Sequence, residues 1–228
     1  MSNRKKIEKE IAKEISTKVS QFGFKLVGIK ELIEFEAIHD NVKWEFWFYL
    51  TNKNIYSLFC KAGVTYVELS EIINTMLNDT ELSRDISIVE DELRITKEDN
   101  SLKISCLEEV NSFCELFFER IKKIKENFWI PCSDPISQME SFKKQHVGHW
   151  INGSMTQNVL LWVSTGIKEN NIEKIEYGFR RGFNWIDEVK RLYGTNYHLE
   201  QDEHFLNALF NKMTEKGYIL PTEITNNQ

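Results

Sequence analysis

The sequence predicts an α+β fold, in which an antiparallel sheet with packed helices precedes a mostly helical C-terminal part. Three observations support this prediction. Apolar residues recur every three or four positions over residues 3–22, as in an amphipathic helix. They alternate with polar residues from Phe24 to about Cys60, as in strands, and return to helical spacing after residue 138. Because 41% of the 228 residues are hydrophobic, the chain can bury a core without disulfides or metal ions.

Residues 3–22 form the first predicted helix, which Gly23 ends. Most of its lysines lie off the apolar stripe, so a basic amphipathic helix on a membrane surface is one interpretation. Interspersed glutamates and the lack of tryptophan favour a helix packed on a sheet instead. The apolar stripe consists of Ile7, Ile11, Ile15, Val19 and Phe22.

Residues 24–60 predict an antiparallel meander, because strand-like runs are separated by the turn-forming sequences HDN and TNKN. The run WEFWFYL is the expected central strand, with one face under a helix and the other half covered. Trp44, Phe46, Phe48 and Leu50 share the first face, and Glu45, Trp47 and Tyr49 share the second.

Beyond the meander, the spacing predicts a helix, a hairpin in DISIVEDELRIT and a long helix, then a boundary at the proline-containing run WIPCSDPISQ. We therefore expect an α+β domain over residues 1–128, a linker over 129–138 and a helical domain or subdomain over 139–228. The helices are expected at residues 68–79, 104–128, 157–168, 172–193 and 200–217, and the hairpin at 85–96.

The net charge and its distribution along the chain indicate which class of partner to expect. The net charge of −6 argues against nucleic acid, and residues 64–116 hold 13 acidic against 4 basic side chains. An acidic surface attracts a basic protein. We expect the EDE run at Glu90 to form a solvent-exposed turn within this surface. The predicted partner-binding residues are Glu90, Asp91, Glu92, Glu98 and Asp99.

Two patterns offer alternative chemistry. His146 and His149, with Cys132 upstream, could face one metal ion on a helix, although Gly148 interrupts it, so the expectation is no metal and no cofactor. Arg191 and His198 in RLYGTNYH resemble the Arg-x4-6-His signature of HEPN-type ribonucleases. That resemblance implies a nuclease that cleaves RNA through its 2′-hydroxyl, but Leu192 follows the arginine where that family usually has a polar residue.

Other features predict structure or binding surfaces. Glu34, Glu36 and Asp40 share one side of a predicted strand, where a solvated face is the simpler interpretation. Gly178 and Gly182 leave one side of a helix without bulk, which favours close helix packing. Sheet aromatics such as Trp47 could line a groove, although most such residues fill cores. Phosphate-binding glycine loops and the GxSxG and HExxH motifs are absent from the sequence.

The phrase FGFK from Phe22 to Lys25, set between an amphipathic helix and aromatic-rich strands, resembles small bacterial families of uncharacterised α+β proteins. Some of these families are thought to be immunity proteins of toxin systems. The resemblance covers residues 1–128 and transfers no catalytic residue. With no signal-like or membrane-spanning segment and no CxxC pair, we expect a cytoplasmic binding protein, and the nuclease or metal enzyme remains the alternative.

Overall fold

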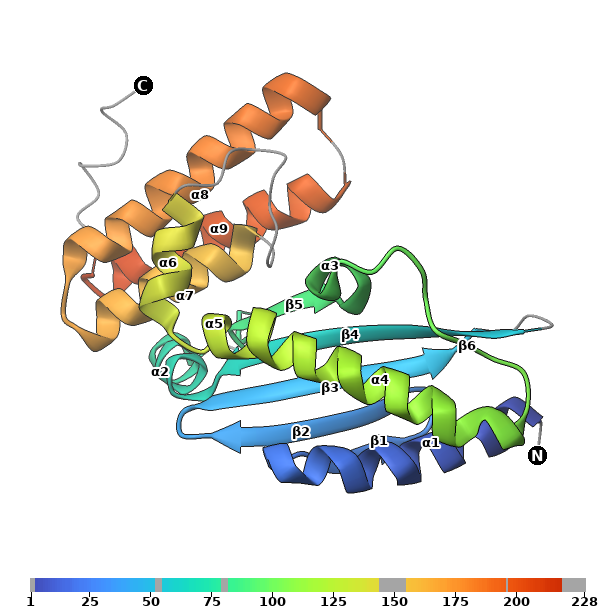
Figure 1. Ribbon diagram of the computed structural model, residues 1–228. Helices are drawn as coiled ribbons and strands as arrows, with labels where there is room; N and C mark the ends of the chain where they lie inside the picture. The colour runs from blue at the N-terminus through green and yellow to red at the C-terminus, as the bar shows by residue number, and fades with distance from the viewer. Residues whose placement is uncertain (1–2, 52–54, 79–81, 144–154, 196, 219–228) are drawn as a thin grey trace. The chain divides into compact units, whose positions relative to one another are not determined.

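The computed structural model describes residues 3–51, 55–78, 82–143, 155–195 and 197–218, without the side chain of Tyr197 (Figure 1). Its contacts divide the chain into two compact units. Unit 1 comprises Met1–Thr65 and Val89–Asp134, and unit 2 comprises Tyr66–Ile88 and Pro135–Gln228. The chain passes from unit 1 to unit 2 for the last time between Asp134 and Pro135, which lie within the predicted linker. Residues 66–88, predicted as part of the first domain, belong to unit 2.

An antiparallel sheet and two long helices form most of unit 1, so the predicted α+β class is confirmed. The strand order is β1-β2-β3-β4-β5, and β6 pairs with β4. The strands are β1 Lys25–Ile29, β2 Ile33–His39, β3 Val42–Leu50, β4 Tyr56–Tyr66, β5 Ser87–Asp91 and β6 Lys103–Ile104. The helices are α1 Asn3–Val19, α3 Glu92–Thr96, α4 Val110–Ile124 and α5 Ile130–Cys132.

One face of this sheet packs under α1 and α4 (Figure 1). Strand alternation points Phe46, Phe48 and Leu50 to this inner face, where each is fully buried, and the Phe48 ring meets the Phe117 ring of α4 at 5.1 Å. Of the predicted apolar stripe, Ile7, Ile11, Ile15 and Val19 of α1 are buried here too, and Phe22, just beyond α1, is half-buried. A membrane therefore cannot bind α1 through that stripe, and the helix-on-sheet interpretation is confirmed.

Unit 2 is helical among its described residues, apart from the strand ends it contributes, as predicted for the C-terminal part. Helix α7 is buried from Met155 to Gly166 except at Gln157, because its neighbours α2, α6, α8 and α9 contact it. Gly178 and Gly182 of α8 allow close approach, since a Cβ on Gly178 would lie 2.7 Å from Trp162 Cβ. The elements are α2 Val67–Leu77, α6 Pro135–Lys143, α7 Met155–Lys168, α8 Ile172–Tyr193 and α9 Tyr197–Glu215.

One local prediction differs from the structure. The hairpin at residues 85–96 is wrong, because β5 runs directly into α3 at Asp91–Glu92. Residues 129–138, the predicted linker, are mainly helical. Proline suits the start of a helix, where its missing N–H removes no hydrogen bond, and Pro131 and Pro135 stand in the first turns of α5 and α6.

The four cysteines are free thiols, and three of them are buried. Burial raises the pKa of Cys114 and of Cys132 to about 12 and that of Cys60 well above its ordinary value. Half-buried Cys106 has a pKa raised by its hydrogen bond to Glu108. Since the thiolate is the reactive form, a thiol reagent near neutral pH should modify Cys106 alone, and slowly, until denaturant exposes all four. Fast modification of several thiols in the folded protein would contradict this packing.

Candidate functional site

The candidate site is the face of the sheet opposite α1 and α4, which we call the open face. Residues opposite one another in the strands gather there, since Glu34 pairs in register with Trp47 and Ile38 with Lys43. On β4 and β5, Phe59, Lys61 and Asp91 alternate with residues that point to the face covered by α1 and α4, so these three residues lie on the open face. The open face includes Lys25, which is opposite Glu36 in the register, together with Glu34, Glu36, Ile38, Lys43, Glu45, Trp47, Tyr49, Phe59, Lys61 and Asp91.

Aromatic side chains lie at the centre of the open face. Trp47, Tyr49 and Phe59 are each half-buried, and the rings of Tyr49 and Phe59 lie 4.9 Å apart with planes tilted by 34°. Ile38 is 68% exposed on the same face. Large side chains held on strands lose little conformational freedom when they are covered, and aromatic residues are enriched at protein interfaces. Exposed and half-buried aromatic and apolar side chains of this kind are common at protein–protein interfaces.

The charges of the open face are only partly balanced. Lys43 pairs with Glu45 at 3.0 Å, and Lys61 pairs with Asp91 at 3.8 Å. Glu34 and Glu36 form no ion pair with any residue that the structure describes. The carboxylates of Glu34 and Glu45 lie over Gly28 and Gly63, so they stay close to the sheet. Lys25 lies opposite Glu36 without forming an ion pair with it, so the face carries four acidic and three basic side chains and a small negative excess.

The predicted partner-binding residues do not form one exposed turn, and that expectation is wrong. Glu90 is 7% exposed and Glu92 is 1% exposed, because both point to the inner side of β5 and the start of α3. Asp91 points the other way and joins the open face. Glu98 pairs with Lys123 at 2.6 Å, and Asp99 is exposed.

A buried charge network accounts for the inward carboxylate of Glu92, whereas Glu90 Oε1 accepts from Arg94 Nη1 at 3.2 Å and from the Asp91 N–H at 2.9 Å. Arg120 of α4 donates from Nη1 to Glu92 Oε1 at 2.6 Å and from Nη2 to the Asn100 carbonyl at 2.9 Å. Burial raises the pKa of Glu92, and the bond from Arg120 opposes this effect. The hydrogen bond from Lys123 lowers the pKa of Glu98. The network ties α3 and the following loop to α4, so its role in the fold is structural.

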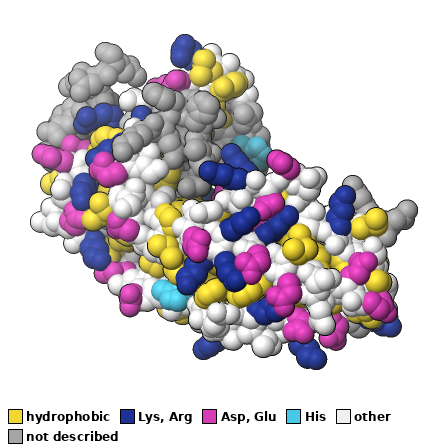
Figure 2. All heavy atoms as spheres, in the orientation of Figure 1, with side chains coloured by type: hydrophobic (Ala, Val, Ile, Leu, Met, Phe, Trp, Pro, Cys, Tyr) yellow, Lys and Arg dark blue, Asp and Glu magenta, His cyan; other side chains and the backbone are white. Residues whose placement is uncertain are grey.

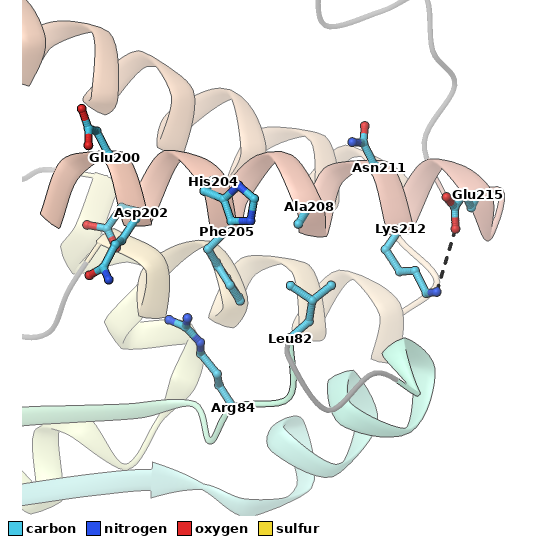
Figure 3. A pocket seen from close by; sticks show the side chains of 11 residues that line it. Leu82, Arg84, Glu200, Asp202, His204, Phe205, Ala208, Asn211, Lys212 and Glu215 are labelled. Atoms are coloured by element: carbon cyan, nitrogen blue, oxygen red, sulfur yellow. Dashed lines mark ion pairs between the residues drawn. The ribbon is translucent and has the colours of Figure 1, made fainter. Parts of the chain in front are cut away.

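A separate hollow of about 750 Å³ lies in unit 2 along α9 (Figure 3). The Arg84 guanidinium lies 4.0 Å from the centroid of the Phe205 ring, and Thr156 donates to Asp202 at 2.7 Å. Lys212 pairs with Glu215 at 3.9 Å farther along the helix. The hollow thus presents charges of both signs, and this mixture favours no single class of ligand.

The residues of the nuclease interpretation lie on two helices. Arg191 is in the last turn of α8, His198 is near the start of α9, and both are exposed. Gly194, with φ +75°, ends α8 between them. Arg191 makes no hydrogen bond or ion pair with any described residue. The structure thus adds no support for a catalytic pair, and the nuclease interpretation stays a prediction.

The metal interpretation involves His146 and His149, which lie outside the described residues. Cys132, the thiol upstream of these histidines, is 2% exposed. Within the described part of the chain, no group of three His, Cys, Asp or Glu side chains is placed to hold a metal ion.

Comparisons with known proteins add no functional assignment. The sequence matches no family model, and no curated protein or solved structure is similar to it. Across the described ranges, no helix is both long and apolar enough to cross a membrane.

Sequence analysis missed two members of the open face, Phe59 and Lys61. The alternation of the run NIYSLFC, continued by one residue to Lys61, is the signal that could have placed them beside Tyr49 and Trp47. It could not show that Lys61 pairs with Asp91, because those residues are 30 positions apart and the predicted hairpin placed Asp91 in a turn.

Proposed function

We propose that this chain is a non-enzymatic binding protein that engages a basic protein partner through the open face of unit 1. An immunity or regulatory protein of a bacterium would have this kind of activity, and that is the role we propose. The observation that carries the proposal is the half-buried aromatic group of Trp47, Tyr49 and Phe59, next to Glu34 and Glu36, whose carboxylates form no ion pair within the described residues.

Charge and ring chemistry together favour a basic partner. A lysine or arginine side chain placed over the Trp47 indole would gain a cation–π contact, worth about 0.5–1 kcal/mol at an exposed site. Its charge would lie near Glu34, the residue opposite Trp47 in the strand register. The same lysine–aromatic contact occurs within the open face, where the Lys61 ammonium lies 5.8 Å from the centroid of the Phe59 ring.

In-cell photocross-linking can test the location of this surface. A benzophenone amino acid replaces Ile38, which is 68% exposed on the open face, and in a matched control it replaces Leu116, which is 58% exposed on α4. We expect position 38 to capture a protein of net positive charge that position 116 does not capture. The captured protein, purified separately, should bind the wild-type chain directly. Equal capture from both positions, or capture of an acidic protein, would refute the proposal.

The other side of unit 1 provides the contrast for this control. Figure 2 shows basic and acidic side chains interspersed over α4, where Lys122 pairs with Glu119 at 2.5 Å and Lys18 of α1 pairs with Glu115 at 2.6 Å. These paired charges leave little net field to attract a partner. Position 116 therefore reports encounters with a surface of balanced charge.

A further inference from the structure

A second hollow, of about 520 Å³, opens in unit 2 among helices α6, α7 and α8. Trp162 of α7 and Tyr177 of α8 line it, with ring centroids 4.5 Å apart and planes tilted by 50°. Lys143, the last residue of α6, places its ammonium 5.2 Å from the Trp162 centroid and 5.8 Å from the Tyr177 centroid. One cation thus lies against two aromatic rings, the arrangement that recognises ammonium ligands.

Carboxylates complete the surroundings of this cation. Lys143 Nζ lies 2.5 Å from Glu140 Oε1, and Glu173 and Glu176 also line the hollow. Of the other basic side chains in the lining, Lys174 pairs with Glu169, and Arg180 is exposed. If Lys143 moved away, Glu140 would lose the cation that pairs with it, and the place beside both rings would be open to another cation.

Lys143 is held weakly enough to be displaced. Its side chain is 39% exposed, and its bond to Glu140 is a surface pair three residues apart on one helix, a type that contributes little stability. A lysine stem has four rotatable bonds, so the ammonium can move into solvent without a change in the backbone. A ligand cation can therefore replace the ammonium without unfolding α6.

We propose that this hollow is a binding site for an ammonium or guanidinium group of a ligand, and that Lys143 occupies the site while the ligand is absent. The cation can belong to a small quaternary amine or to a basic side chain, since both offer the charge that the rings and Glu140 recognise. This site lies in unit 2 and does not depend on the open face.

Nuclear magnetic resonance titration of the Trp162 indole N–H tests the proposal. The probes are tetramethylammonium, N-acetylarginine amide and, as an uncharged control of similar size, tert-butanol. Lys143→Ala should bind at least one of the two cations about fivefold more tightly than the wild type, because a competing cation–π contact has been removed. The stronger cation shows whether the site prefers a quaternary amine or a side-chain guanidinium.

Lys122→Ala is the matched control. Lys122 also pairs with a glutamate three residues before it, Glu119, and its ammonium lies 5.0 Å from the Phe118 centroid, but in unit 1. This variant should bind the probes at Trp162 like the wild type. In the Lys143→Ala background, Glu140→Gln and Tyr177→Leu should each weaken binding if the carboxylate and ring recognise the cation.

Three results would overturn the proposal. The first is the lack of a saturable shift with either cation in Lys143→Ala, in a sample whose spectrum shows a folded protein. The second is an equal response to tert-butanol, which would indicate an apolar site. The third is equal affinity of the wild type and Lys143→Ala, which would mean that Lys143 does not occupy the site.

Discussion

Replacing Arg120 by methionine should lower the free energy of unfolding by about 3–5 kcal/mol, because the change leaves a buried carboxylate without its partner. Glu92 is 1% exposed and receives the 2.6 Å bond from Arg120, so water cannot replace the lost interaction. Urea denaturation followed by circular dichroism measures the loss. The matched control is Lys123→Met, which removes a cation from the same helix where the pair with Glu98 is partly exposed, and it should change stability little.

The effect of Arg120→Met should depend on pH. Burial already raises the pKa of Glu92 above its ordinary value of 4.5, and loss of the guanidinium raises it further. A carboxyl group with a raised pKa in the folded state contributes stability below its ordinary pKa and loses it as the pH rises through the folded pKa. The loss should therefore be larger near pH 8 than near pH 5. An equal loss at both pH values would mean that Glu92 is not the group left unpaired.

Removing both charges separates the ion pair from packing. In Glu92→Leu with Arg120→Met, no buried charge remains, and apolar replacements of similar volume are often neutral. We expect this double variant to recover most of the stability that Arg120→Met loses. Failure to recover would indicate that the bond from Arg120 to the Asn100 carbonyl, rather than the charge on Glu92, is the main contribution.

Gly178→Ala should destabilise unit 2 by about 1–3 kcal/mol, although alanine favours helices by about 1 kcal/mol over glycine. The new Cβ would lie 2.7 Å from Trp162 Cβ, an atom that cannot move without its backbone. Gly182→Ala should be milder, because its neighbours Val159 Cγ2 and Leu206 Cδ1, at 2.7 and 2.9 Å, can rotate away.

Thermal unfolding of the two glycine variants compares these effects. Asn184→Ala, at an exposed position of α8, is the control and should be neutral or slightly stabilising. A larger fall in melting temperature for Gly182→Ala than for Gly178→Ala would contradict this expectation. It would show that the backbone of α7 shifts away from a new Cβ more readily than the Val159 and Leu206 side chains rotate.

The sequence predicted those parts of the fold that have local periodicity. Alternation in WEFWFYL correctly separated buried Phe46 and Phe48 from half-buried Trp47. The pair Gly178 and Gly182 correctly indicated close helix packing. In each case the pattern lies within one strand or helix. The surface that packs against that element needs only to be apolar, so its sequence does not have to be known.

Prediction failed where a polar residue is buried by a distant partner. Glu92 points inward from the start of α3, but a buried carboxylate is expected only where a cation meets it. Arg120, the cation for Glu92, is 28 positions away on α4. Similarly, Lys143, Trp162 and Tyr177 come from three helices, so no spacing in the sequence indicates the cation hollow.

The burial of Glu90 and Glu92 determines which residues should be replaced to test the binding surface. Replacing Glu90, Asp91 and Glu92 together would remove the carboxylate that Arg120 binds and destabilise unit 1, so lost binding would be uninformative. Glu34 and Glu36 make no ion pair within the described residues and lie on the open face. Replacing both by glutamine removes the charge and keeps the shape.

The most direct measurement is the association rate of the cross-linked partner with the wild type and with Glu34→Gln/Glu36→Gln, by stopped-flow fluorescence at low and high salt. Oppositely charged surfaces speed up encounter, and salt screens this effect, with a Debye length of about 8 Å at 0.15 M. We predict several-fold slower association of the variant at low salt, nearly unchanged dissociation, and converging rates near 1 M salt. Equal association rates at low salt would contradict the open face as the surface that attracts a basic partner.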